Sequence, residues 1–135
     1  MKIKKKELTK ALTNLESLKT LPLEGIVSLS VIKLTKSVTD NKKKHEDARK
    51  EVMQAYCAKK EDGSLDVETR QAGAEMYEYY NFGTPEKSKE AFDKVEEIEN
   101  EEISIDVYKT ITEQYIESLG KITPDQVNGL LLLTE

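Results

Sequence analysis

The sequence has very few of the residues on which most catalytic and metal-binding sites depend. Among its 135 residues it contains one cysteine, Cys57, one histidine, His45, and no tryptophan. A single cysteine excludes an internal disulfide and a cysteine-based zinc site, and a single histidine excludes most histidine-rich metal sites and catalytic centres. The sequence also lacks a glycine-rich phosphate loop and a dinucleotide-binding fingerprint. We therefore expect no cofactor, no bound metal and no enzymatic activity.

Long apolar segments are missing as well. The longest apolar run, Leu130–Leu133, is far shorter than the roughly 18 residues that a membrane-spanning helix requires. The first six residues are mainly basic, and no apolar signal segment follows them. With 37% hydrophobic and 35% charged residues, the chain can form one modest core. We expect a single helical domain over residues 1–135, cytoplasmic and without contact to a membrane.

Charge is divided unevenly along the chain. Residues 1–60 carry a net charge of +8 and residues 61–135 a net charge of −13. Either the two halves fold against each other with interleaved charges, or each half faces a different partner. The densest basic cluster, Lys42–Lys44, has acidic residues among its neighbours and no aromatic side chains on which bases could stack. Nucleic acid is therefore not an expected partner.

The strongest pattern is a series of side chains spaced alternately by four and three residues. Its members are Val27, Val31, Leu34, Val38, Asn41, His45, Ala48, Val52 and Ala55. This heptad spacing predicts a helix from about residue 25 to residue 57, about 50 Å long at 1.5 Å per residue. Such a helix is longer than a compact domain of this size, so we expect an elongated protein. Asp40-Asn41 is the natural place for a break, but the spacing continues through it and favours an unbroken helix.

Two polar residues lie in this seam. Asn41 and His45 occupy positions that apolar side chains usually fill. A polar residue in a helical seam can fix the register and the oligomeric state at some cost in stability. We therefore expect either a helical hairpin or a homodimer built on the seam, with Asn41 and His45 as candidate interface residues.

Shorter segments complete the predicted fold. Ile3 and the alternating segment Ile103–Val107 predict two short strands that pair with each other. Further helices are predicted over about residues 5–20, 67–80, 85–98, 111–119 and 124–133. In the helix that begins at Pro85, Phe92 is expected on the buried face together with Ala91 and Val95. The predicted class is mainly α: an elongated helical bundle with a long helical hairpin and at most a small two-stranded β element.

Half of the aromatic residues are concentrated in one short stretch. Tyr77, Tyr79, Tyr80 and Phe82 all lie within six positions. On the predicted helix they would point in several directions, so at least one would be exposed. Tyrosine is a frequent anchor of protein interfaces, which makes these four residues candidates for an interaction surface. Packing into the core is the alternative explanation, and the sequence leaves both open.

Several features also occur together in a known group of proteins. They are Met1–Lys4 with Glu7-Leu8, the charged helix ending near Tyr56, Glu61-Asp62-Gly63, the segment Ile103–Val107, and Thr123-Pro124. In this layout the chain resembles small phage- and prophage-encoded proteins of uncharacterised function. The resemblance implies a phage accessory protein that acts in a bacterial cytoplasm, and it supplies no catalytic residue.

Three functions follow as hypotheses from these observations. The leading one is a non-enzymatic phage-type accessory protein that acts by binding another protein, with a host bacterial protein as one candidate partner. The second is an acidic inhibitor or modulator of a host nucleic-acid enzyme of the restriction or CRISPR type, based on the charge of −13 over residues 61–135. The third is a structural or assembly component of the virion.

Overall fold

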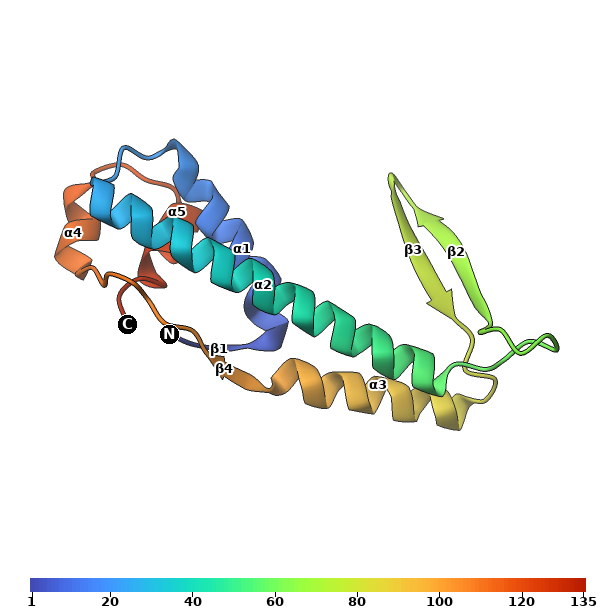
Figure 1. The fold of residues 1–135 in the computed structure, drawn as a ribbon. Coiled ribbons are helices and arrows are strands. Elements are labelled where there is room, and N and C mark those ends of the chain that lie inside the picture. The colour runs from blue at the N-terminus through green and yellow to red at the C-terminus, as the bar shows by residue number, and fades with distance from the viewer. The chain divides into compact units, whose positions relative to one another are not determined.

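A computed structural model describes all residues, Met1–Glu135, and shows a mainly α-helical chain with two small antiparallel strand pairs (Figure 1). The elements in chain order are β1 (Lys2–Lys4), η1 (Lys5–Glu7), α1 (Leu8–Glu16), η2 (Ser17–Thr20), α2 (Gly25–Tyr56), β2 (Val67–Ala72), β3 (Glu75–Tyr80), α3 (Pro85–Asn100), β4 (Glu102–Ser104), α4 (Glu113–Ser118) and α5 (Pro124–Leu131). The chain divides into two compact units, residues 1–44 with 100–135, and residues 45–99. None of the helices combines the length and the apolar character that crossing a membrane requires.

The first unit joins the N-terminal strand to a distant segment, as predicted. Strand β1 pairs antiparallel with β4, and Ile3 lies opposite Ile103. The N-terminal ammonium group donates a hydrogen bond to the carbonyl oxygen of Ile105, at 2.8 Å. Because Ile3 is buried while Lys2 and Lys4 are exposed, the alternating sequence presents one apolar side chain to the core.

The core of this unit is built from the apolar faces of its helices. Its most deeply buried apolar side chains are Leu8, Leu15, Leu18, Leu34, Val38, Leu130 and Leu133. The helix predicted over residues 5–20 is confirmed as the continuous series η1, α1 and η2. Helix α5 begins with a capping box, in which Thr123 Oγ1 accepts from the Gln126 amide and the Gln126 side chain accepts from the Thr123 amide.

Helices α1 and α5 approach each other closely at a glycine. A Cβ atom added to Gly129 would lie 2.5 Å from the carbonyl oxygen of Asn14. Gln126 strengthens the same contact, because its Nε2 donates to the Ser17 carbonyl oxygen and to Thr20 Oγ1, each at 3.2 Å. The absence of a side chain at residue 129 is therefore what allows the two backbones to meet.

Helix α2 is continuous through Asp40-Asn41, which confirms the unbroken helix expected from the heptad spacing. In the first part of the seam, Val27, Leu34 and Val38 are buried in the chain's own core. The Asn41 side chain is half-buried, and its Nδ2 donates to the Ser37 carbonyl oxygen of the same helix at 2.8 Å.

The second unit, residues 45–99, contains the end of α2, the β2–β3 hairpin and α3. Its small core consists of Cys57, Tyr80, Phe82 and Ala91, with Met53, Tyr56, Leu65 and Val67 packed against them. Helix α3 begins where predicted, and the Lys87 amide donates to Thr84 Oγ1 at 3.2 Å. The predicted burial of Phe92 is wrong: the ring is largely exposed and only meets Phe82 edge-on, with centroids 5.9 Å apart.

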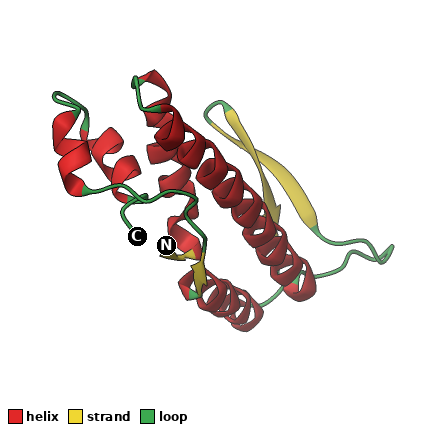
Figure 2. Ribbon diagram, turned by 60° about the vertical axis from the view of Figure 1, so that its left-hand side comes forward, coloured by secondary structure: helices red, strands yellow, loops and turns green.

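The helix predicted over residues 67–80 is also wrong, because these residues form the antiparallel hairpin β2–β3 (Figure 2). The chain therefore has a second two-stranded element besides β1–β4, so the expectation of at most one such element is wrong. The hairpin turns at Gly73-Ala74, where Gly73 has a φ of +63° that a residue with a side chain rarely adopts. Glycine at the first position of a two-residue turn favours the type II′ geometry, which matches the twist of the flanking strands.

Candidate protein-interaction surface

The hairpin register divides the aromatic residues between two faces. Because side chains alternate along a strand, Tyr77 and Tyr79 share one face of β3, whereas Tyr80 points to the other. Tyr77 and Tyr79 are 47% and 44% exposed, and Tyr80 is only 9% exposed. Phe82, just beyond the strand, is buried as well. The structure therefore places two of the four predicted interface aromatics at the surface and two in the core of residues 45–99.

The exposed aromatic face also carries an arginine, Arg70. Arg70 lies opposite Tyr77 in the register, and its guanidinium is 3.6 Å from the ring centroid of Tyr79. The same guanidinium donates from Nε and Nη2 to Glu68 Oε2, at 3.2 and 3.1 Å. This cation–π contact and ion pair hold Tyr79 in a defined orientation. We call the side formed by Glu68, Arg70, Ala72, Glu75, Tyr77 and Tyr79 the hairpin face.

The surroundings of the hairpin face are acidic. Residues 61–80 contain six carboxylates and one basic side chain, Arg70, which gives this segment a net charge of −5. At its start, Asp62 Oδ1 accepts from the Ser64 hydroxyl at 2.6 Å and from the Ser64 amide at 2.9 Å. These hydrogen bonds lower the pKa of Asp62, so its charge persists to lower pH. A basic surface is therefore the electrostatic complement of this segment.

A cleft of about 790 Å³ lies between β3 and the end of α2. Its apolar lining comes from Met53, Met76, Tyr77 and Tyr80. Its charged lining comes from Glu46, Arg49, Lys50, Glu75 and Glu78. Met76 is also 65% exposed, so both faces of β3 offer apolar surface beside charged groups. Such a mixture is typical of surfaces that contact polypeptides.

The buried tyrosine has a strongly perturbed acidity that can be measured. The pKa of Tyr80 is raised to about 12. The largest cause is burial; the hydrogen bond from the Tyr80 hydroxyl to Glu78 Oε2, at 2.6 Å, and the negative charge of Glu78 add to it. Because the pKa is higher in the folded chain than the unfolded value of about 10, folding is favoured by this group below pH 10. That contribution is lost as the pH rises from 10 to 12.

We expect the absorbance difference between the native chain and Tyr80→Phe, followed at 295 nm, to show an ionisation near pH 12. Glu78→Gln should lower that midpoint, because it removes the negative charge that opposes ionisation. Tyr79→Phe, which removes the hydroxyl of an exposed tyrosine, serves as the matched control. A difference curve for Tyr80→Phe with a midpoint at or below pH 10 would contradict the buried hydrogen bond.

The residues with the greatest catalytic potential are far apart. His45 and Cys57 are twelve residues apart, and helix α2 is continuous to Tyr56, which separates them by about 18 Å along the axis. The Cys57 thiol is buried, with Sγ at 3.4 Å from the carbonyl oxygens of Ala58, Asp66 and Asn81. No group of three or more histidine, cysteine or acidic side chains is arranged to hold a metal ion.

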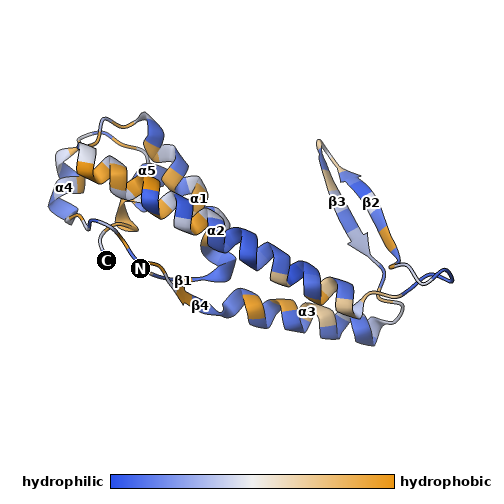
Figure 3. Cartoon of the chain, viewed as in Figure 1, coloured by the Kyte–Doolittle hydropathy of each residue, from blue (hydrophilic) through white to orange (hydrophobic).

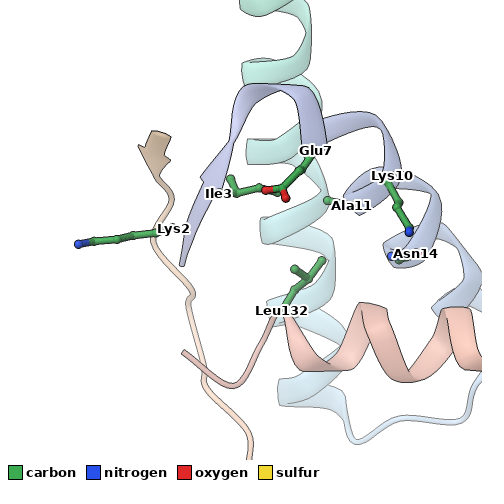
Figure 4. A pocket seen from close by; sticks show the side chains of 7 residues that line it. All are labelled: Lys2, Ile3, Glu7, Lys10, Ala11, Asn14 and Leu132. Atoms are coloured by element: carbon green, nitrogen blue, oxygen red, sulfur yellow. The ribbon is translucent and has the colours of Figure 1, made fainter. Parts of the chain in front are cut away.

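A smaller hollow of about 270 Å³ lies in the first unit, between β1, α1 and the end of α5 (Figure 4). Ile3, Ala11 and Leu132 supply its apolar lining. The Glu7 carboxylate points into the middle of the group, whereas the Lys2 side chain extends away from the other residues. Glu7 Oε2 already accepts from the Lys4 amide at 3.1 Å, in the cap of the first helical turn. Glu7 thus has a structural role in this hollow.

The two polar seam residues lie on α2 and do not belong to the β2–β3 hairpin. Asn41 belongs to the unit of residues 1–44 and 100–135, and His45 belongs to residues 45–99. Both side chains are half-buried on α2.

Glu68, Arg70 and Met76 were not predicted as surface residues of a β-hairpin, because the sequence pattern assigned them to a helix. Their alternation with Thr69 and Tyr77 around Gly73 is the signal that could have identified them.

Neither a protein-family model, nor a curated protein, nor a solved structure matches this chain. The resemblance to phage-encoded proteins therefore stays a prediction. Functional inference rests on the residues of the chain itself, and the hairpin face is a surface on which two exposed tyrosine rings and charged side chains coincide.

Proposed function

We propose that this chain is a non-enzymatic accessory protein of phage type that acts in a bacterial cytoplasm by binding another protein through the hairpin face. The observation that carries the proposal is the pair Tyr77 and Tyr79, which lie side by side and nearly half exposed on one face of β3. A chain has little reason to leave two adjacent tyrosine rings in water unless a partner covers them. Tyrosine is also enriched among residues that dominate binding energy.

The contacts of Tyr79 reduce the conformational entropy that its side chain would lose on binding a partner. Tyr79 is already ordered by Arg70, which is in turn fixed by Glu68. A preordered side chain loses less conformational entropy when a partner covers it than a freely rotating one does. The net charge of −5 over residues 61–80 favours a partner with a basic surface and accelerates the encounter at low salt.

The test is the double variant Tyr77→Ala with Tyr79→Ala. We expect capture of the partner from host lysate to fall more than about tenfold, since hot-spot tyrosines contribute about 2 kcal/mol or more each. The melting temperature should stay within about 2 °C, because neither ring belongs to a core cluster. Tyr108→Ala, which removes an exposed tyrosine from the other unit, is the matched control and should leave capture unchanged. Undiminished capture by the double variant would contradict the proposal.

The acidity of the hairpin supports a second candidate function, inhibition or modulation of a host nucleic-acid enzyme. In this alternative the carboxylates of residues 61–80 occupy the basic channel in which a restriction or CRISPR effector holds phosphates. The variant with Glu68→Gln, Glu75→Gln and Glu78→Gln should then lose binding, and binding of the native chain should weaken steeply with added salt. Salt-insensitive binding that depends only on the tyrosines would favour the first function.

We also propose that the end of α2 pairs with α3 as a helical hairpin that supports β2–β3. Met53 and Tyr56 of α2 pack against the cluster that contains Ala91 of α3. Arg49 Nε lies 3.9 Å from Glu99 Oε1, which adds an exposed ion pair of modest strength. This pairing would use the later positions of the heptad seam and would give the hairpin face a rigid base.

A further inference from the structure

The outer edge of β2 is an open strand edge. The sheet that contains β2 has two strands, β2 and β3, so one edge of β2 has no strand beside it. Residues 68–72 are exposed, and among residues 45–99 no helix or other strand lies along this edge in Figure 1 or Figure 2. The strand contains neither lysine nor proline, which commonly protect such edges from pairing. The edge can therefore accept a further strand.

The hydrogen bonds of the hairpin show which backbone groups point towards this edge. The Asn81 amide donates to the Asp66 carbonyl oxygen at 3.1 Å, so the pair that continues the β2–β3 register at this end is hydrogen-bonded. Hydrogen-bonded and non-hydrogen-bonded pairs alternate along an antiparallel ladder. Thr69 and Gln71 therefore direct both their amide and their carbonyl groups away from β3.

Val67 has the same orientation, but it offers only an acceptor. Its amide already donates to the Leu65 carbonyl oxygen of the same strand end, at 3.1 Å. The open edge thus presents donors at Thr69 and Gln71, and acceptors at Val67, Thr69 and Gln71. An added antiparallel strand centred on Thr69 would pair with all of these groups.

The charges of β2 make this edge complementary to itself. When two copies pair antiparallel about Thr69, Glu68 of each copy lies opposite Arg70 of the other. This is a non-hydrogen-bonded position, where opposite side chains lie closest and opposite charges stabilise the pair. Within one chain Glu68 Oε2 already accepts from the Arg70 guanidinium. In the pair the four charges would therefore alternate in sign, each between two of the opposite kind.

No other register gives this arrangement. Centring on Val67 would set Glu68 opposite Asp66 of the second copy, and like charges at opposite positions are destabilising. Centring on Gln71 would set Arg70 opposite an alanine. The outer edge of β3 offers no opposite charges in any register, because β3 carries acidic side chains and no basic one. The charges therefore select the β2 edge and the register centred on Thr69.

The carboxylates of β3 do not prevent this pairing. Glu75 and Glu78 are separated from the second copy by the width of β2, so they lie about two strand spacings, or about 10 Å, from its nearest strand. This is about one Debye length at 0.1 M salt, which weakens their repulsion. The contacts of Glu68 with Arg70 are direct and are screened much less.

We propose that two copies of the chain form a homodimer by pairing antiparallel along the outer edges of β2, with the two-fold axis at Thr69. The result is a four-stranded sheet of order β3-β2-β2-β3, in which each contact occurs twice. A two-stranded hairpin has marginal stability, and added strands increase it. The colouring of β2 and β3 in Figure 3 is mainly hydrophilic, so main-chain hydrogen bonds and ion pairs, more than apolar burial, hold this dimer together.

The dimer is independent of the function proposed above. Its contact uses the edge of β2, so the hairpin faces of both copies stay exposed and lie on the same side of the four-stranded sheet. The contact is small relative to interfaces of standard size, so the dimer dissociates on dilution.

Sedimentation velocity over a concentration series, at about 0.1 M salt, tests the dimer in the intact chain. We expect the native protein to shift from monomer to dimer as its concentration rises. Glu68→Arg and Arg70→Glu should each weaken the dimer at least about fivefold, because each sets like charges opposite one another. The two variants change the net charge in opposite directions, so general repulsion between copies cannot explain both losses. Glu90→Arg, at an exposed position of α3, is the matched control and should have no effect.

Mixing the two variants tests the pairing itself. In a heterodimer of Glu68→Arg with Arg70→Glu, opposite charges again lie opposite each other, so an equal mixture should regain most of the native affinity. This rescue also shows that neither variant has lost the hairpin. A native chain that stays monomeric at every concentration, single variants of native affinity, or a mixture no stronger than its components each overturns the proposal.

Disulfide trapping tests the antiparallel register. Opposite Cα atoms at a hydrogen-bonded pair are about 5.5 Å apart, within the reach of a disulfide, so Thr69→Cys should form a linked dimer under a mild thiol oxidant. The two copies of Gln71 are four residues apart along the strands, about 14 Å, so Gln71→Cys should not. The native chain, whose one cysteine is buried, is the blank. Equal linking of Gln71→Cys indicates parallel pairing and overturns the proposal, as does binding of a foreign extended peptide at this edge without self-association.

Discussion

Replacing Gly129 with alanine is expected to destabilise the unit of residues 1–44 and 100–135 by about 1–3 kcal/mol, the range seen when a packed site receives an extra methyl group. The new Cβ atom would lie 2.5 Å from the carbonyl oxygen of Asn14 and 3.0 Å from its carbonyl carbon. Both are backbone atoms of α1, so they cannot rotate away as a flexible side chain could. Relief requires α1 and α5 to separate, which also weakens the bonds that Gln126 makes to Ser17 and Thr20.

The sign of this effect is informative, because alanine normally stabilises a helix relative to glycine by about 1 kcal/mol. Gly25 in the first turn of α2 provides the matched control, since no atom lies within 4 Å of a Cβ added there. We expect Gly25→Ala to be neutral or stabilising and Gly129→Ala to lower the melting temperature by several degrees. Calorimetry of both variants measures the difference. Equal stability of Gly129→Ala and the native chain would show that α1 and α5 are farther apart than described.

The long helix and the β1–β4 pair could be predicted because each is encoded by a regular local pattern. Val27, Leu34 and Val38 recur at helical spacing, and all three are buried. Ile3 and Ile103 alternate with polar residues, and they lie opposite each other in the register. Thr123 and Gln126 stand three residues apart, as a capping box requires. In each case the burial or the hydrogen bond follows from spacing along the chain.

The hairpin could not be predicted in the same way, because most of its side chains are exposed. Ala72, Met76 and Tyr79 are spaced as on one face of a helix, yet none of them is buried. Hydrophobic periodicity carries information only where one face is buried, so the helical spacing here was coincidental. Gly73, which lies within the predicted helix, forms the turn of the hairpin. The division of Tyr77 and Tyr79 from Tyr80 follows directly from the two-residue period of the strand.

The exposed apolar side of α2 and the exposure of Phe92 depend on which side of a helix the rest of the chain covers. Ile26, Leu29 and Ile32 are as apolar as the buried residues of α2, and sequence alone does not show which set remains in water. Phe92 follows Ala91 directly, and one residue rotates a helix by 100°, which moves the ring away from the core. Both surfaces therefore become visible only once tertiary packing is known.

Ser30→Ala is the second substitution for which we expect a large loss of stability, because it removes a buried hydroxyl group. Ser30 is fully buried on α2, and its Oγ donates to the Lys109 carbonyl oxygen at 2.9 Å and accepts from the Lys109 amide at 3.1 Å. Ser30→Ala removes both hydrogen bonds, and an intramolecular hydrogen bond contributes a net of about 0.5–1.5 kcal/mol to stability. Because only one oxygen atom is removed, the loss reports mainly on these hydrogen bonds and little on packing.

Thr39→Ala is the matched control, because the exposed Thr39 hydroxyl only bonds to the Thr35 carbonyl oxygen of its own helix, at 2.7 Å. We expect Ser30→Ala to lower the free energy of unfolding by about 2 kcal/mol and Thr39→Ala to change it by less than about 0.5 kcal/mol. Amide hydrogen exchange provides the local measurement: the Lys109 amide should exchange faster in Ser30→Ala, since its acceptor is gone. The adjacent Tyr108, whose ring centroid lies 3.8 Å from Lys33 Nζ, would then lose its fixed position. Unchanged protection of the Lys109 amide would show that Ser30 does not anchor this segment.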